Sequence, residues 1–160
     1  MKIDLKGILF RGFHENEAGK CKIFRDGKWI RGTWVYGYPE PHNDMFLYIG
    51  EANEIKVPEG AIRRRYLVRP DTLCEAVRNV HDINGKPIFE NDVAYLPKRG
   101  GSFDNMRVWI RFCNGLPSYT ILGHRPRELW TNTLDQQAIA NLNIIGNIYE
   151  NPELVAEVTE

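Results

Sequence analysis

The sequence predicts a mostly-β protein with little helix. Short stretches of alternating apolar and polar residues recur along the chain, each bounded by Gly, Pro, Asn or Asp. Three dipeptides typical of tight hairpin turns lie between such stretches: Asp26-Gly27, Asn84-Gly85 and Asn114-Gly115. Many short strands separated by turn signals are typical of small barrels or sandwiches.

The first half of the chain is predicted to contain one strand, one hairpin and several shorter strands. The strand lies within 3–13, and the hairpin pairs 21–24 with 29–38 around Asp26-Gly27. We expect the prolines of 38–41 to end this hairpin, because proline removes a donor from the ladder. Shorter strands are predicted at 45–49, 54–57 and 66–68. Residues 72–78 form either one or two helical turns or an extended connection.

The second half is organised around 81–96, which reads as a strand end, a turn at Asn84-Gly85, a short strand, a kink and a strand entering the core. A second hairpin joins 106–113 to 119–122, and 129–133 is a strand or a turn. Residues 134–142 are the best helix candidate, and 143–150 have a strand pattern that Asn151-Pro152 ends.

Composition fits a soluble protein with a core of its own. The length of 160 residues is enough for one domain or two small ones. A hydrophobic content of 42% is enough for a core, and 26% charged residues is ordinary for a soluble protein. We place a boundary near 70–80. The charges balance at 21 basic and 21 acidic residues, but unevenly: 98–127 carry six cations against Asp104, and 150–160 form an acidic tail.

Several classes of protein are excluded by what the sequence lacks. Cys21, Cys74 and Cys113 are odd in number and far apart, which argues against both a disulfide framework and a zinc site. The chain opens without a secretory leader and contains no apolar run of membrane-spanning length. We therefore expect a cytoplasmic protein with no cofactor, no metal and no membrane partner.

Five stretches together resemble one family, the YopX-like proteins of phages and prophages of Gram-positive bacteria. They are 10–12 (FRG), 27–38 (GKW and WVYGY within it), 68–72 (VRPDT), 82–93 (DINGKPIFENDV) and 144–154 (IIGNIYENPEL). The resemblance runs almost end to end and is most specific in the last two; 39–65 match poorly. It implies an SH3-like β-barrel over roughly the second half of the chain and a phage origin. Together with the strand pattern and the charges, this predicts an N-terminal β-rich region over 1–75 and a barrel over 76–155, with an acidic tail at 150–160.

The family resemblance brings no catalytic residues to this chain. At one place the chain departs from the family pattern, with Glu90-Asn91-Asp92 where the family usually has Glu-Gly-Asp. Asparagine is the commonest non-glycine residue at positive φ, so the backbone shape can survive the exchange. We therefore assign structural turn roles to the motif residues of the two most specific stretches: Asp82, Asn84, Gly85, Glu90, Asn91, Asp92, Gly146, Asn147, Tyr149, Glu150, Asn151 and Pro152.

Acidic residues around the central hairpin are the one candidate for catalysis. Asp82, Glu90 and Asp92 lie near His81, and carboxylates beside a histidine can carry acid–base chemistry or hold a divalent metal. The alternative is that Asp82 and Asp92 cap turns through their side-chain oxygens, as aspartate commonly does beside Asn-Gly. We favour the turn caps.

The cations of 98–127 are the candidate nucleic-acid contact. Glycines following Lys98 and Arg99 would let a backbone approach a phosphate, and aromatic residues at 109, 119 and 130 would offer surfaces for base stacking. The hypothesis assigns binding to six residues: Lys98, Arg99, Arg107, Arg111, Arg125 and Arg127. No Walker-type motif accompanies them, so nucleotide hydrolysis is not indicated.

The favoured function is a non-enzymatic binding or adaptor protein in the host cytoplasm. Its partner is an unknown protein or a nucleic acid, and a homo-oligomer is a further alternative. We expect Trp29 and Trp34 of the first hairpin to lie in the core, whereas their exposure would indicate a protein interface. A small enzyme built on Asp82, Glu90 and Asp92 is the least favoured alternative.

Overall fold

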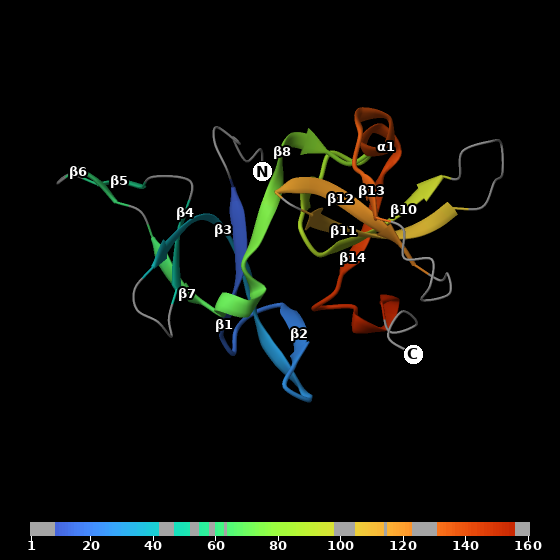
Figure 1. Cartoon of the computed structure of the whole chain (residues 1–160). Helices are drawn as coiled ribbons and strands as arrows, with labels where there is room; N and C mark the ends of the chain where they lie inside the picture. The colour runs from blue at the N-terminus through green and yellow to red at the C-terminus, as the bar shows by residue number, and fades with distance from the viewer. Residues whose placement is uncertain are drawn as a thin grey trace. The chain divides into compact units, whose positions relative to one another are not determined.

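A computed structural model gives the fold of most of the chain (Figure 1). It describes residues 9–41, 47–51, 55–57, 60–62, 64–97, 105–113, 115–122 and 131–155. The fold is mostly β, as the sequence predicts. Contacts within the chain divide it into two compact units, Met1–Arg78 and Asn79–Glu160.

The first unit is built on a large antiparallel sheet in the order β7-β4-β3-β1-β8, with β2 paired to the free end of β3. A separate ribbon pairs β5 with β6. The strands are β1 (Phe10–Glu15), β2 (Cys21–Arg25), β3 (Lys28–Pro41), β4 (Leu47–Glu51), β5 (Ile55–Val57), β6 (Gly60–Ile62), β7 (Arg65–Val68) and β8 (Cys74–His81). The strand predicted within 3–13 is β1; residues 1–8 lie outside the described ranges.

Strand β3 is longer than the sequence predicts. We expected the prolines of 38–41 to end it, but pairing continues through Pro39↔Ile49 and Pro41↔Leu47. The expectation was wrong because the two prolines are two residues apart, so both missing N–H donors face the same edge of the strand. On that edge pairing with β1 has already ended at Gly37. Tyr38 and Glu40 remain able to bond to β4.

A short corner with one buried residue, Thr72, joins β7 to β8. Val35, Ile49 and Val68 form an apolar cluster beside it. Pro70–Thr72 make a single 3-10 turn, η1, and residues 74–78 are extended, which settles the two alternatives for 72–78. Thr72 is fully buried, and its Oγ1 accepts from Phe13 N at 2.9 Å while donating to the Arg69 carbonyl at 2.7 Å. This corner is therefore tied to β1.

The second unit is a curled five-stranded antiparallel sheet in the order β13-β12-β11-β10-β14 (Figure 1). Its buried face includes Ala94, Val108 and Ile110. The elements are β9 (Pro87–Phe89), β10 (Asp92–Pro97), β11 (Asn105–Cys113), β12 (Leu116–Ile121), β13 (Thr131–Thr133), α1 (Gln136–Asn141), β14 (Asn143–Asn147) and the 3-10 turn η3 (Pro152–Leu154). Strand β9 pairs with β8 and is not part of the five-stranded sheet. The SH3-like assignment of this unit stays a prediction.

The helix predicted at 134–142 is confirmed as α1. Asp135 begins it by accepting a hydrogen bond from Ala138 N at 2.8 Å, the geometry of an N-cap. The three cysteines, Cys21, Cys74 and Cys113, are not joined in disulfides in this structure. Within the described ranges, no helix is long and apolar enough to cross a membrane.

Candidate functional site

The β2–β3 hairpin follows directly from its sequence. Asp26 and Gly27 both have positive φ, 53° and 76°, as a two-residue hairpin turn of this handedness requires. The turn sets the register, pairing Phe24 with Trp29 and Ile23 with Ile30. Ile23 and Ile30 are buried, so the residues on either side of them point to the opposite face.

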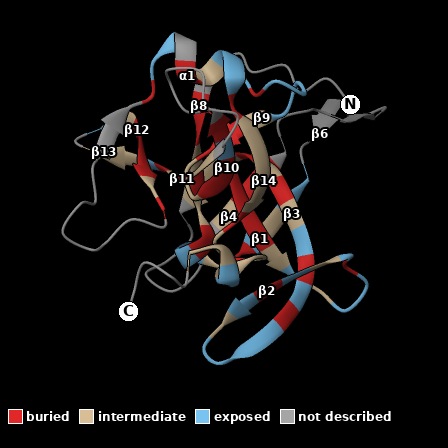
Figure 2. Ribbon diagram, turned by 90° about the vertical axis from the view of Figure 1, so that its right-hand side faces the viewer, coloured by how far each residue is buried: buried red, intermediate tan, exposed pale blue. Residues whose placement is uncertain are grey.

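That opposite face, which we call the hairpin face, consists of Lys22, Phe24, Trp29 and Arg31. Trp29 is 53% exposed and Phe24 39%, and their rings meet edge to face with centroids 5.4 Å apart. Figure 2 shows the alternation of buried and exposed residues along β3 toward this hairpin. The expectation that Trp29 lies in the core was wrong, because the Asp-Gly turn places it opposite Phe24 on the side away from Ile30. Trp34 is half-buried and packs edge-on against Phe13.

Ion pairs fasten the hairpin to the corner that follows β7. Arg69 lies 3.1 Å from Asp26 at the hairpin turn, and Arg25 of β2 lies 3.2 Å from Asp71. Arg69 also approaches Asp71 at 3.5 Å and Glu15 at 3.9 Å. Single exposed ion pairs contribute little to stability, but several that share Arg69 fix the orientation of the hairpin.

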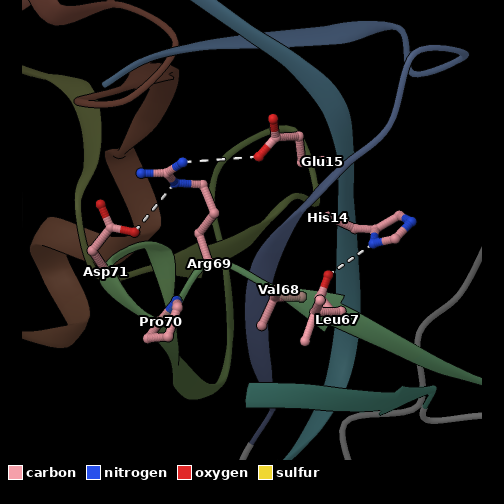
Figure 3. A pocket seen from close by; sticks show the side chains of 7 residues that line it. All are labelled: His14, Glu15, Leu67, Val68, Arg69, Pro70 and Asp71. Atoms are coloured by element: carbon pink, nitrogen blue, oxygen red, sulfur yellow. Dashed lines mark hydrogen bonds and ion pairs between the residues drawn. The ribbon is translucent and has the colours of Figure 1, made fainter. Parts of the chain in front are cut away.

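A pocket of about 290 Å³ adjoins these ion pairs (Figure 3). Its walls are His14, Glu15, Leu67, Val68, Arg69, Pro70 and Asp71. Glu15 reaches toward Arg69, whereas His14 turns to the Leu67 carbonyl, 2.7 Å from its Nδ1. A carbonyl only accepts, so His14 Nδ1 carries a proton. The pocket combines ion-paired and apolar walls, and its lining contains no Ser, Thr, Cys or Lys side chain.

Asp82 holds the central hairpin together. Its Oδ1 accepts from Asn84 N at 2.9 Å and Lys86 N at 2.8 Å, and its Oδ2 accepts from Ile144 N at 3.1 Å. The turn is completed by Gly85 at φ 79°, while Asn84 is not at positive φ. The Asn84 side chain donates to Asn143 Oδ1 instead. The carboxylate of Asp82 thus joins the hairpin to β14.

The second buried acid of this stretch, Asp92, also caps a turn. Asp92 is 2% exposed, and its Oδ2 accepts from Phe89 N at 2.8 Å. Glu90 is half-buried in the turn between them, and His81 is exposed. Among the described residues, no group of three or more His, Cys, Asp or Glu side chains could hold a metal ion. These contacts are those of turn caps.

Asn91 does more than replace glycine. Its φ is 68°, as expected for a glycine substitute. Its side chain also accepts from Trp109 Nε1 at 3.1 Å and donates to Tyr149 Oη at 3.0 Å. Its backbone N–H donates to the Ile110 carbonyl, and its carbonyl accepts from Ile148 N. Asn91 therefore links β11 to the turn that follows β14, which the sequence did not indicate.

The GNIYENP segment forms a compact turn after β14. Asn147 Oδ1 accepts from Tyr149 N and Glu150 N at 3.0 and 2.9 Å, so the strand predicted to reach residue 150 ends at Asn147. Asn151 Oδ1 accepts from Asn147 N at 3.3 Å, and Pro152 begins η3. These contacts are all internal to the turn.

Gly146→Ala is expected to destabilise this turn. A Cβ at Gly146 would lie 2.2 Å from Asn151 Oδ1 and 2.8 Å from its Cγ. We expect a loss of about 1–3 kcal/mol in the free energy of unfolding, measured by urea denaturation. In the double variant with Asn151→Ala the clash is removed, so the two losses should not add. Full additivity would contradict the packing described here.

Only part of the cationic region 98–127 lies within the described residues. Lys98, Arg99, Arg125 and Arg127 fall outside them. Arg107 and Arg111 lie on the same face of β11, on either side of Trp109, and the Arg111 guanidinium lies 4.5 Å from the Trp109 ring centroid. Of the proposed stacking residues, Tyr119 is buried at 8% exposure, so that role was wrong for it. Trp130 lies outside the described residues.

The hairpin face was missed by sequence reasoning, although a signal was present. The Asp26-Gly27 turn fixes which residues are opposite, and counting outward pairs Phe24 with Trp29 and Lys22 with Arg31. Burial of Ile23 and Ile30 then leaves these four residues facing solvent. The register of the hairpin shows which residues share a face, and the number of aromatic residues alone does not.

The chain is a two-unit, mostly-β protein with an exposed aromatic hairpin. A family model described as YopX protein matches residues 46–156, and the chain belongs to this family. The match contains both of the most specific stretches and also 46–65, where we expected a poor resemblance; 10–12 and 27–38 lie outside it. Comparisons with curated proteins and with solved structures find no significant match.

Proposed function

We propose that this chain is a non-enzymatic binding protein of phage origin that acts in the host cytoplasm. Its contact would be the hairpin face, and its partner a polyanion, either a nucleic acid or an acidic protein surface. The supporting observation is the pairing of two exposed aromatic rings, Phe24 and Trp29, with two exposed cations, Lys22 and Arg31, on one strand face. Alternation places no carboxylate on this face of β2 or on the paired part of β3.

Charge-neutral variants of the hairpin face provide the test. The double variant with Lys22→Gln and Arg31→Gln should elute from heparin at a lower salt concentration than the unchanged protein, because two cations that contact the polyanion are lost. The matched control is Arg64→Gln with Lys86→Gln, which removes the same charge from exposed positions elsewhere. Equal losses in both variants, or no retention of the unchanged protein at low salt, would refute the proposal.

The cationic region 98–127 supports a second candidate, nucleic-acid binding through the second unit. The observation in its favour is the Arg111 guanidinium over the Trp109 ring, with Arg107 on the same face. Lys98→Ala with Arg99→Ala tests it on the same column. If this pair reduces retention and the hairpin variant does not, the second candidate replaces the first.

A further inference from the structure

We propose that the partner of the hairpin face is single-stranded nucleic acid, with bases stacked on Phe24 and Trp29 and phosphates bound by Lys22 and Arg31. This inference rests on the binding function proposed above and names the class of its partner.

The aromatic pair favours unpaired bases. Trp29 is more than half exposed, and its edge-to-face contact with Phe24 leaves ring surface in water. Stacking a base on such a ring contributes about 1–3 kcal/mol and does not depend on sequence. In a duplex the faces of the bases are covered by their neighbours, so only a single strand can offer them without unstacking.

Among the described residues, no carboxylate forms an ion pair with either cation of the hairpin face. Lys22 and Arg31 are directly opposite each other in the register, and like charges at such a pair are unfavourable in a sheet. Arg31 Nη1 donates to the Gly19 carbonyl at 3.3 Å, which leaves its charge uncompensated by a carboxylate. A bound phosphate would relieve this repulsion.

The spacing suits a nucleotide chain. The Lys22–Arg31 pair is two residues along the hairpin from the Phe24–Trp29 pair. Two residues of a strand span roughly 7 Å, so the cations lie within reach of the backbone of a nucleotide whose base stacks on the aromatic pair. One nucleotide can therefore stack on the aromatic pair while its neighbouring phosphate meets the cations.

The hairpin is held ready for binding by contacts on its other side. Asp26 of the hairpin turn forms an ion pair with Arg69 at 3.1 Å, and Arg25 forms one with Asp71 at 3.2 Å. These ion pairs compensate the charge of Asp26 and restrict movement of the hairpin. The hairpin then loses less conformational entropy on binding, which favours affinity.

Binding of the full chain to a fluorescein-labelled dT12 oligonucleotide, followed by anisotropy, tests the inference. We expect saturable binding at 50 mM salt, weakened at least tenfold by Trp29→Ala. Lys22→Gln with Arg31→Gln should reduce the slope of log K against log salt by roughly 1.4, about 0.7 for each lost phosphate contact. Leu116→Ala, which removes another exposed apolar side chain, should leave binding unchanged.

Competition distinguishes this inference from the function on which it rests. Unlabelled dT12 should displace the probe at lower concentration than the same length of duplex or poly-glutamate. If heparin retention depends on Lys22 and Arg31 but duplex binds as well as dT12 and Trp29→Ala has no effect, single-strand recognition is wrong and polyanion binding stands. More effective competition by poly-glutamate would assign the face to an acidic protein. Absence of both heparin and oligonucleotide binding would remove both proposals.

Discussion

Replacing Asp82 with alanine is expected to cost about 3–5 kcal/mol of the free energy of unfolding. The carboxylate is 6% exposed and accepts three backbone hydrogen bonds, from Asn84, Lys86 and Ile144. Alanine would leave those N–H groups without this acceptor, and bonds to a charged group are stronger than neutral ones. Ile144 belongs to β14, whereas Asn84 and Lys86 belong to the hairpin turn. The substitution would therefore destabilise both of these elements of the second unit.

Asp82→Asn is the matched variant. Its amide oxygen can still accept from Asn84 N and Lys86 N, but its NH₂ group would face the N–H of Ile144. We therefore expect an intermediate loss, with the same dependence on denaturant as the unchanged protein when urea unfolding is followed by circular dichroism. A loss below 1 kcal/mol for Asp82→Ala would show that the three bonds do not hold this unit together.

The features that local chemistry determines could be predicted from the sequence. Asp26-Gly27 gives a hairpin because both residues accept positive φ, and Asp135 begins α1 because its side chain satisfies the N–H of Ala138. The mostly-β class follows from alternation and turn residues along the chain. Each of these inferences depends on residues a few positions apart.

The features that depend on partners distant in sequence could not be predicted. Pro39 and Pro41 look like strand breakers until β4 is known to pair with the edge that they leave intact. Asn91 looks like a simple replacement for glycine until its side chain is seen to accept from Trp109 Nε1 and donate to Tyr149 Oη. The local sequence alone did not settle either case, because a distant side chain or a neighbouring strand supplied the deciding hydrogen bond.

The candidate site illustrates the same division. The cations of 98–127 are conspicuous because they are close in sequence, but only Arg107 and Arg111, on one face of β11, lie within the described residues. The hairpin face is inconspicuous in sequence, because Lys22 and Arg31 are nine positions apart and become neighbours only through the register. Its recognition requires the turn geometry first and the charges second.

Asn91→Ala is expected to cost about 2–4 kcal/mol, and Asn91→Gly about half as much. Both variants lose the side-chain bonds to Trp109 and Tyr149, which together contribute about 1–2 kcal/mol. Alanine must in addition adopt φ 68°, a left-handed conformation that costs it about 1–2 kcal/mol and costs glycine almost nothing. The difference in stability between the two variants therefore measures the cost of the left-handed backbone conformation. The loss of stability in the glycine variant measures the contribution of the side-chain hydrogen bonds.

Urea denaturation gives both losses, and the indole N–H signal of Trp109 in a ¹H–¹⁵N NMR spectrum reports the bond directly. That signal should move in both variants, because each removes the oxygen that accepts from Trp109 Nε1. If Asn91→Gly is as stable as the unchanged protein, the asparagine serves only as a substitute for the glycine usual in the resembled family. A measurable loss would mean that this chain has used the departure from the glycine pattern to link β11 to the turn after β14.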